Sequence, residues 1–242
     1  MAKIRGLFLV IFWFTAIGLC GPILILLCYL TKDENYIYKP IGWFVRLGLA
    51  MVGVKVDVKG LEHLDPTQPY IFTPNHQSFI EVPLFVTYLG RNPGYLAKKE
   101  VFKYPVFGPG IRMMGVIPVD RSNSPAAVES AKQATRNIRR GKSFMVYPEG
   151  TRSKDGTLLP FKKGAFMMAI EAGVPIVPVT VSGATKIMPK GEFKLFPSTV
   201  HLIIHEPIST KDYSKENVSD LMQRTRAKIY SALSIEEAAI NQ

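Results

Sequence analysis

The sequence predicts an α/β fold, a sheet flanked by helices, behind an apolar N-terminal helical region. Short apolar runs alternate with helical stretches after about residue 53, as in α/β proteins. No charged residue occurs at positions 6–31, so the N-terminal region differs from the rest of the chain and is typical of a membrane-associated helix. With 242 residues and 47% apolar side chains, the chain can bury one large core. We therefore expect an N-terminal membrane-anchoring helical region at 1–53 and an α/β domain at 54–242.

The apolar run from Leu7 to Leu30 is long enough for one membrane-spanning helix of ~20 residues. Gly18, Gly21 and Pro22 divide it into halves, each about half as long as the ~30 Å hydrocarbon core of a bilayer. A hairpin dipping into one leaflet, a kinked single span and a signal sequence all fit this pattern. We expect the hairpin, because it matches the break in the middle.

Charges near the apolar run favour a location at the cell membrane, on its cytoplasmic face. Lys3 and Arg5 precede the run, and a hairpin would return the chain to the same side. Cys20 and Cys28 both lie inside the run, so they form no disulfide framework, which fits a reducing compartment. The protein would then be monotopic or single-span. The next segment, 38–52, is typical of an interfacial amphipathic helix or of a helix packed on the core.

The α/β region begins with short apolar runs that predict seven strands. These are expected at 55–59, 70–73, 94–97, 115–119, 143–147, 175–181 and 200–204. The clearest helix follows residue 121: Ser124 can cap it, Pro125 suits its first position, and Gly141 ends it. Its inner stripe is expected to be Ala127, Ala131, Ala134 and Ile138.

One histidine has a local setting that suggests chemistry. Asn75 and His76 follow the strand at 70–73, and strand ends commonly carry function in open α/β sheets. Glu81 lies five residues after His76, so the two can meet only if His76 stands in the turn and Glu81 in the first helical turn. The carboxylate would then fix the imidazole tautomer and leave the other ring nitrogen free as a base.

A second motif, Tyr147–Arg152, stands at the end of the strand at 143–147. Its Pro and Gly residues predict a sharp turn with exposed N–H groups, and Arg152 can hold phosphate oxygens through two hydrogen bonds. Arg121 and Lys162 add positive charge after other strand-like segments. The net charge of +11 fits an anionic partner, although charge alone selects neither a metabolite, a membrane surface nor a nucleic acid.

Four ordered blocks between about residues 55 and 210 resemble the membrane-associated glycerolipid acyltransferases, especially the bacterial 1-acylglycerol-3-phosphate acyltransferases. The blocks are Asn75–Glu81, Lys98–Arg121, Tyr147–Ser153 and Val174–Val179. The resemblance implies a mixed sheet flanked by helices. It also implies transfer of a fatty acyl group from acyl-CoA or acyl carrier protein to the sn-2 hydroxyl of lysophosphatidic acid, which gives phosphatidic acid for phospholipid synthesis.

The resemblance implies specific residue roles as well. His76 would be the general base and Glu81 its partner, although the family usually has Asp at the second position. The residues that match the family's phosphate and glycerol contacts are Arg121, Glu149, Gly150, Thr151 and Arg152, with Asn75, Lys98 and Lys162 as additional candidates. No cofactor and no metal are expected. The expected partners are the bilayer, lysophosphatidic acid and the thioester donor.

Other functions have weaker support in the residues. His201 and His205 lie ~13 Å apart along a strand, too far to chelate one metal. There is no Gly-x-Ser-x-Gly hydrolase motif and no recognised nucleic-acid-binding motif, so we expect no nucleic-acid partner. Two alternatives stay open: acylation of glycerol 3-phosphate or another lysolipid, and an inactive membrane-bound protein that binds anionic lipids.

Overall fold

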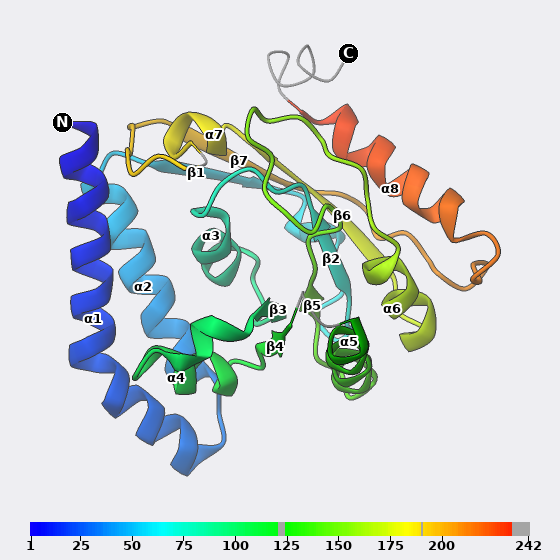
Figure 1. The fold of residues 1–242 in the computed structure, drawn as a ribbon, viewed down its shortest axis with the longest axis horizontal. Coiled ribbons are helices and arrows are strands. Elements are labelled where there is room, and N and C mark those ends of the chain that lie inside the picture. The colour runs from blue at the N-terminus through cyan, green and yellow to red at the C-terminus, as the bar shows by residue number, and fades with distance from the viewer. Residues whose placement is uncertain (121–123, 190, 234–242) are drawn as a thin grey trace.

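One mixed sheet forms the centre of the molecule in the computed structural model, which describes residues 1–120, 124–189 and 191–233 (Figure 1). In these residues the sheet has seven strands in the order β1-β7-β6-β2-β5-β3-β4. They are β1 (Lys55–Lys59), β2 (Ile71–Pro74), β3 (Gly94–Lys98), β4 (Ile117–Val119), β5 (Phe144–Met145), β6 (Ile176–Ser182) and β7 (Thr199–Ile204). All seven predicted strands are confirmed, with ends within two residues of those expected.

The direction of the strands makes the sheet mixed. β6 and β7 pair antiparallel, and each other neighbouring pair is parallel. The carboxyl ends of β2, β3, β4, β5 and β6 therefore meet at one edge. Because His76, Lys98 and the Tyr147–Arg152 motif follow β2, β3 and β5, this edge collects the predicted functional residues.

Helices cover both faces of the sheet (Figure 1). The helices are α1 (Ala2–Thr31), α2 (Asn35–Met51), α3 (Glu81–Tyr88), α4 (Phe107–Met113), α5 (Ser124–Arg139), α6 (Gly164–Ala172), α7 (Ala184–Ile187) and α8 (Val218–Ser231), with 3-10 turns η1 (Leu61–His63) and η2 (Lys99–Lys103). In the ribbon, α1 to α4 lie on one side and α5, α6 and α8 on the other. Helix α5 agrees with the expected one, and Ala134 and Ile138 are fully buried. The side chain of Ser124, the expected cap, lies outside the described residues.

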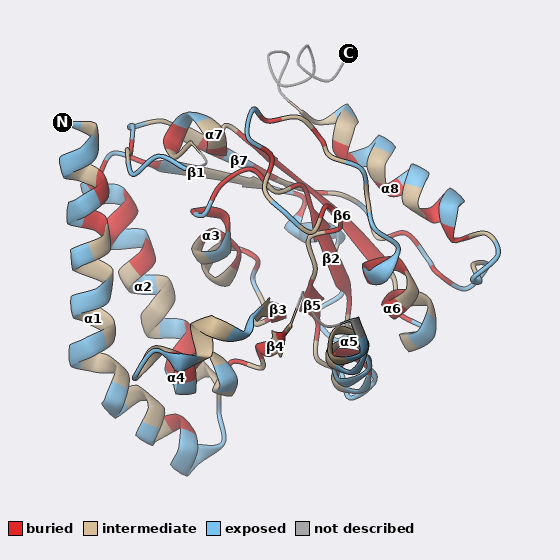
Figure 2. Ribbon diagram, in the orientation of Figure 1, coloured by how far each residue is buried: buried red, intermediate tan, exposed pale blue. Residues whose placement is uncertain are grey.

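The core has two parts, one on each face of the sheet (Figure 2). Successive residues of a strand point to opposite faces, so Ile71 joins the cluster with α5 and α6 while Phe72 joins the cluster with α2 and α3. Phe144 and Met145 divide in the same way. Burial on both faces explains why the parallel strands read as continuous apolar runs.

The expected break at residues 18–22 is wrong. Helix α1 runs without interruption from Ala2 to Thr31 with Pro22 inside it. A proline removes one helical hydrogen bond and crowds the preceding turn, but packing holds both halves of α1. The first half packs on α2, where the Nε1–H of Trp13 donates to the carbonyl of Phe44 (3.2 Å). In the second half, Gly21 lies against Val106, just before α4.

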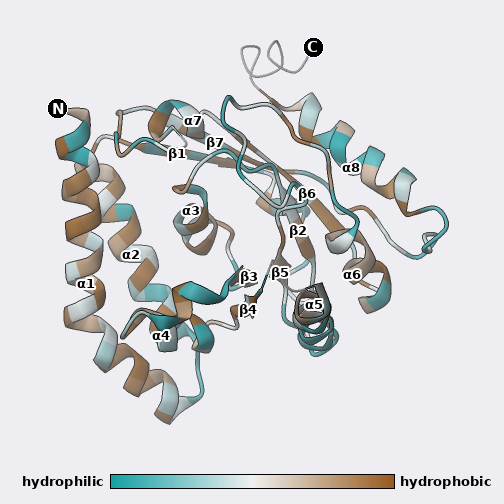
Figure 3. Cartoon of the chain, in the orientation of Figure 1, coloured by the Kyte–Doolittle hydropathy of each residue, from teal (hydrophilic) through white to brown (hydrophobic). Residues whose placement is uncertain are grey.

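The hairpin expected within residues 7–30 is therefore absent, and α1 instead packs against α2, with the turn between the two helices after Thr31. Helix α2 packs on the core through Tyr38, Val45 and Leu49, while Trp43 stays 60% exposed. Apolar colour covers most of the length of α1 (Figure 3). The exposed apolar side chains of α1 include Ile4, Leu7, Ile11, Phe14, Leu19, Ile23, Leu26 and Leu30. By length and composition, α1 is a helix that could cross a membrane.

Candidate active site

His76 and Glu81 meet at the carboxyl end of β2. His76 stands in the turn after the strand, and Glu81 is the first residue of α3, which is the arrangement the spacing required. The distance from Nδ1 of His76 to Oε2 of Glu81 is 2.6 Å. The His76 side chain keeps 17% of its surface exposed, whereas Glu81 is completely buried. The ring is therefore held on its Nδ1 side and reachable from solvent.

The carboxylate of Glu81 is held at both oxygens. Its Oε1 accepts hydrogen bonds from the backbone N–H groups of Gln77 (2.7 Å) and Ser78 (2.6 Å), while Oε2 faces the imidazole. Burial raises the pKa of Glu81, and the hydrogen bonds from His76, Gln77 and Ser78 oppose that rise. The ionised form satisfies all three donors at once, and it requires the Nδ1–H tautomer of His76.

This geometry accommodates Glu where the family usually has Asp. The extra methylene lengthens the side chain by ~1.5 Å, yet the carboxylate still reaches both the imidazole and the two N–H groups. Because α3 begins at Glu81 itself, the side chain folds back over the turn at residues 77–78. The longer side chain is thus fully used in hydrogen bonding.

The second motif surrounds His76 from the neighbouring strand. The ring of Tyr147 stacks on the imidazole, with centroids 3.7 Å apart and planes 24° from parallel. The backbone N–H of Ser153 donates to the carbonyl of His76 (2.7 Å). The two motifs, 71 residues apart in the chain, therefore form one site.

Glu149 joins the two motifs through backbone hydrogen bonds. Its Oε1 accepts from the N–H of His76 (2.8 Å) and its Oε2 from the N–H of Leu159 (3.1 Å). The residue is 3% exposed, and burial raises its pKa to about 7. Both carboxylate oxygens of Glu149 thus accept hydrogen bonds from the protein backbone. Its contact with substrate stays a prediction.

Asn75 ties the site to the next strand, β6. Its side-chain Oδ1 accepts from the N–H of Val181 (2.7 Å), and its Nδ2 donates to the carbonyl of the same residue (2.8 Å). The side chain thus imitates one more step of sheet pairing beyond β2. A contact of Asn75 with substrate stays a prediction.

The predicted cations lie around the same edge. The guanidinium of Arg152 stacks on the exposed ring of Phe79 at 3.5 Å, and partial burial lowers its pKa. Lys162 lies against Gly150, with Nζ 3.0 Å from the place where a Cβ on that glycine would stand. Gly150 has φ of +70°, a conformation that favours glycine. Thr151, next in the turn, is exposed.

Two further residues predicted for the site, Lys98 and Arg121, lie at or just after the ends of other strands in the sequence. Lys98 ends β3, where its ammonium lies 3.7 Å from the carboxylate of Glu100. Arg121 lies outside the described residues, directly after Asp120 at the end of β4. Lys98 stands at the carboxyl end of its strand, so the sheet topology directs it to the edge that holds His76, and the role of Arg121 stays a prediction.

Sequence reasoning missed three contributors to the site. Tyr147 was part of the quoted motif, but nothing in the sequence indicated that it stacks on His76. The N–H of Leu159 and the side chain of Arg226, which donates to the carbonyls of Leu158 and Leu159, had no local signal. Arg226 is 67 residues from Leu159 in the chain. Only the fold brings it to this loop.

The other histidines have different surroundings. His201 pairs with Asp57 across β7 and β1 (3.1 Å), and His205 hydrogen-bonds to Thr180 (2.9 Å). Within residues 1–120, 124–189 and 191–233, no group of three or more His, Cys, Asp or Glu side chains is arranged to hold a metal ion. The described site thus consists of a base, a carboxylate and nearby cations.

The residues that form this site lie in a region of the sequence that matches a known protein family. The sequence model of a family described as Acyltransferase matches residues 55–182, just over half of the chain. The chain belongs to this acyltransferase family. The matched range contains both motifs and six of the seven described strands in full, β1 to β6.

Several relatives within the family carry names that state an activity. The chain is 43% identical over 156 residues to the 1-acyl-sn-glycerol-3-phosphate acyltransferase BAT2, chloroplastic, of Brassica napus, a match that covers 64% of this chain and 45% of that protein. It is 33% identical over 244 residues to LPAT1, chloroplastic, of Arabidopsis thaliana, covering 97% of this chain and 66% of that one. The chain thus spans between about half and two thirds of these relatives.

A solved structure extends the comparison over nearly the whole fold. The 1-acyl-sn-glycerophosphate acyltransferase PlsC from Thermotoga maritima superposes with a TM-score of 0.80 at 30% identity and covers 95% of each chain. The likeness therefore includes the N-terminal helices as well as the sheet. The predicted fold class, a mixed sheet flanked by helices, is confirmed, and a continuous apolar N-terminal helix takes the place of the apolar hairpin expected within residues 7–30.

Proposed function

We propose that this chain transfers a fatty acyl group from a thioester donor to the sn-2 hydroxyl of 1-acyl-glycerol 3-phosphate, which gives phosphatidic acid for phospholipid synthesis. The observation that carries the proposal is the 2.6 Å contact between His76 and a fully buried Glu81. Arg152 lies in the turn after β5, next to Ser153, whose N–H donates to the carbonyl of His76. The printed names of the relatives support the choice of acceptor.

The proposed reaction uses His76 as a general base. Its Nε2 removes the proton of the acceptor hydroxyl while the hydroxyl oxygen attacks the thioester carbonyl carbon. The tetrahedral intermediate collapses by breaking the C–S bond, and the imidazolium returns the proton to the leaving thiolate. Glu81 stabilises the imidazolium and holds Nδ1 protonated. Because the acceptor hydroxyl itself attacks the thioester, no covalent acyl-enzyme is formed.

The acceptor's phosphate would bind beside this base. Arg152 offers a planar guanidinium. The N–H of its neighbour Ser153 donates to the carbonyl of His76, and the charge of Glu81 acts on the guanidinium, which supports a phosphate position near the base. Gly150, Thr151 and Arg121 complete the predicted phosphate and glycerol contacts, with Lys98 and Lys162 as additional cations. Holding the phosphate in place positions the sn-2 hydroxyl against Nε2.

An assay of the full-length protein in detergent tests the proposal. Lysophosphatidic acid or glycerol 3-phosphate is supplied with acyl-CoA or acyl carrier protein, and the lipid product is identified by mass spectrometry. We expect phosphatidic acid from the first acceptor, and a roughly 100- to 10,000-fold loss of turnover in His76→Ala because general-base catalysis contributes about that much. His201→Ala is the matched control, since this histidine also contacts a carboxylate.

The outcomes separate the alternatives. Product formed only from glycerol 3-phosphate or another lysolipid would replace the proposed acceptor. Lipid binding without any acyl transfer would favour the inactive lipid-binding protein. Full turnover in His76→Ala would remove His76 from the mechanism.

The N-terminal region, residues 1–53, is proposed to anchor the α/β acyltransferase domain, residues 54–242, to the cytoplasmic face of the cell membrane. Exposed apolar side chains on α1 and Trp43 on α2 support this, since water-exposed apolar surface of that extent is costly. A bilayer-facing site would receive the lipid acceptor from the membrane and the donor from solution. We expect Leu19→Glu with Ile23→Glu to release protein from sedimenting liposomes; retention equal to wild type would contradict the anchor.

A further inference from the structure

A loop beside the site is fastened to the C-terminal helix by a single arginine. On α8, Arg226 donates from Nη2 to the carbonyl of Leu158 (2.8 Å) and from Nη1 to the carbonyl of Leu159 (2.9 Å). Its guanidinium also lies 5.6 Å from the centre of the Phe161 ring. A guanidinium that bridges two adjacent carbonyls fixes the orientation of the peptide between them.

The fixed loop in turn holds Glu149. The N–H of Leu159 donates to Oε2 of Glu149 (3.1 Å), while the N–H of His76 donates to Oε1 (2.8 Å). A continuous series of hydrogen bonds therefore runs from α8, through Leu159 and Glu149, to the backbone of His76. Glu149 is 3% exposed, so water competes little for these bonds.

We infer that Glu149 and Arg226 are positioning residues for His76: Arg226 fixes the loop at 158–159, and Glu149 transmits that fixed geometry to the backbone of His76. This inference rests on the proposed function and adds residues that act through the base. Arg226 lies outside the region matched by the family, which ends at residue 182.

Electrostatics favours this role for Glu149 over contact with the acceptor's phosphate. A carboxylate beside a phosphate would repel it, whereas two N–H donors stabilise the carboxylate where it lies. The imidazole of His76 already has Glu81 on Nδ1 and Tyr147 on its face. Neither of these contacts fixes the main chain of residue 76. Glu149 does so at the N–H, and the N–H of Ser153 does so at the carbonyl.

Ionisation of Glu149 gives the test a pH signature. The groups that act on it are Glu81 from α3, which raises its pKa, and Arg226 from α8, which lowers it, besides the donors on His76 and Leu159. Its pKa of about 7 means that the carboxylate loses its charge as pH falls through neutrality. A protonated carboxyl accepts poorly at its O–H oxygen, so one of the two hydrogen bonds weakens. Activity should therefore fall as Glu149 becomes protonated.

The experiment compares Arg226→Lys, Arg226→Gln and Glu149→Gln in the full-length chain by kcat, acceptor KM and pH profile. We expect each to lower kcat by roughly 10- to 100-fold, the size typical of small misplacements of a catalytic group, with KM within about 2-fold. Arg226→Gln removes a positive charge that lowers the pKa of Glu149, so the acid limb should move to higher pH. Arg226→Lys keeps the charge and should leave the limb in place. Glu149→Gln removes this ionisable group, so the fall in activity as pH drops through neutrality should become shallower.

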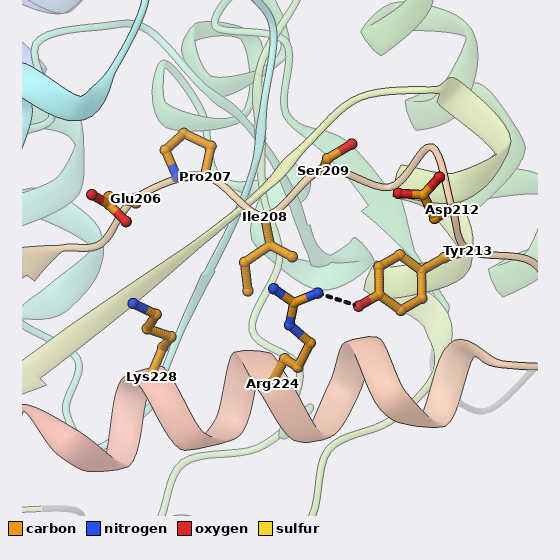
Figure 4. A pocket seen from close by; sticks show the side chains of 8 residues that line it. All are labelled: Glu206, Pro207, Ile208, Ser209, Asp212, Tyr213, Arg224 and Lys228. Atoms are coloured by element: carbon orange, nitrogen blue, oxygen red, sulfur yellow. Dashed lines mark hydrogen bonds between the residues drawn. The ribbon is translucent and has the colours of Figure 1, made fainter.

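Arg224 provides the matched control on the same helix. Figure 4 shows its guanidinium directed to the hydroxyl of Tyr213 (2.7 Å), in a cleft of about 380 Å³ lined also by Glu206, Asp212 and Lys228. Among the described residues, the guanidinium of Arg224 donates to Tyr213, whereas the carbonyls of Leu158 and Leu159 accept from Arg226. Arg224→Gln should keep wild-type kcat and the wild-type pH profile.

The outcomes distinguish the inference from the proposed function. If the wild-type chain transfers no acyl group, the proposed function fails. If it is active and the Arg226 variants match Arg224→Gln, the inference fails. A merely structural role would lower the folded fraction and scale all rates equally, without moving the acid limb, and this result would also overturn the inference. Should Arg226→Gln not fold, Arg226→Lys still decides through its kcat and KM.

Discussion

Two described histidines are hydrogen-bonded to a carboxylate, and the two pairs differ in nearly every other respect. His76 and Glu81 are 2.6 Å apart with side chains 17% and 0% exposed. His201 and Asp57 are 3.1 Å apart with side chains 48% and 43% exposed. The first pair spans a turn between β2 and α3, and the second joins the neighbouring strands β7 and β1.

The carboxylates differ in what holds them. Glu81 accepts two backbone N–H groups in addition to the imidazole, whereas Asp57 has a distant ammonium from Lys59 at 4.0 Å. A buried charge–dipole arrangement retains its strength, whereas water screens an exposed pair. The comparison teaches that a histidine next to an acid becomes a positioned base only when the acid itself is fixed and shielded.

The largest expected effect separates the two acids by activity. Glu81→Ala should lower kcat by on the order of 100- to 10,000-fold, because the imidazole loses the partner that sets its tautomer. Asp57→Ala should stay within about 2-fold of wild type, since exposed pairs contribute little. Initial rates at saturating donor and acceptor measure both. Equal turnover in Glu81→Ala and wild type would contradict a catalytic role for the His76–Glu81 pair.

Glu81→Asp should have a smaller effect on kcat. This substitution tests how strongly turnover depends on the position of the carboxylate. The shorter side chain withdraws the carboxylate by ~1.5 Å, so we expect a roughly 10- to 100-fold loss of kcat through misplacement. Asp is usual at this position in the family, yet here the turn at 77–78 is built around Glu. Turnover equal to wild type would mean that the start of α3 shifts to restore the contact. Glu81→Ala serves as the lower reference.

Much of the sheet could be predicted from the sequence because its parallel strands are buried on both faces. Ile71-Phe72 and Ile176-Val177 read as apolar runs for that reason, and turn residues delimit them. The continuous α1 could not be predicted from Gly18, Gly21 and Pro22. Local propensity favours a break there, and contacts with α2 and α4 override it.

The site could be predicted only where its members are close in the chain. Five residues separate His76 from Glu81, so the spacing could be tested against helix geometry. Glu149 and His76 are 73 residues apart, and Arg226 reaches Leu159 across 67 residues. Such contacts leave no periodic pattern, because each depends on how strands and helices pack. The sequence motif indicated that Glu149 belongs to the site, but it did not indicate that its carboxylate accepts from the N–H groups of His76 and Leu159.

The smallest expected effect concerns stability and completes the comparison of the two pairs. In a double-mutant cycle of His201→Ala and Asp57→Ala, the coupling in the free energy of unfolding should be below about 0.5 kcal/mol and should fall with added salt. The same cycle at His76 and Glu81 should give a larger, salt-insensitive coupling of about 1.5–3 kcal/mol, the range for hydrogen bonds to charged groups. The cycle matters because Glu81→Ala alone also leaves the N–H groups of Gln77 and Ser78 without their acceptor. Urea unfolding at two salt concentrations measures all four variants, and equal couplings would show that burial does not distinguish the pairs.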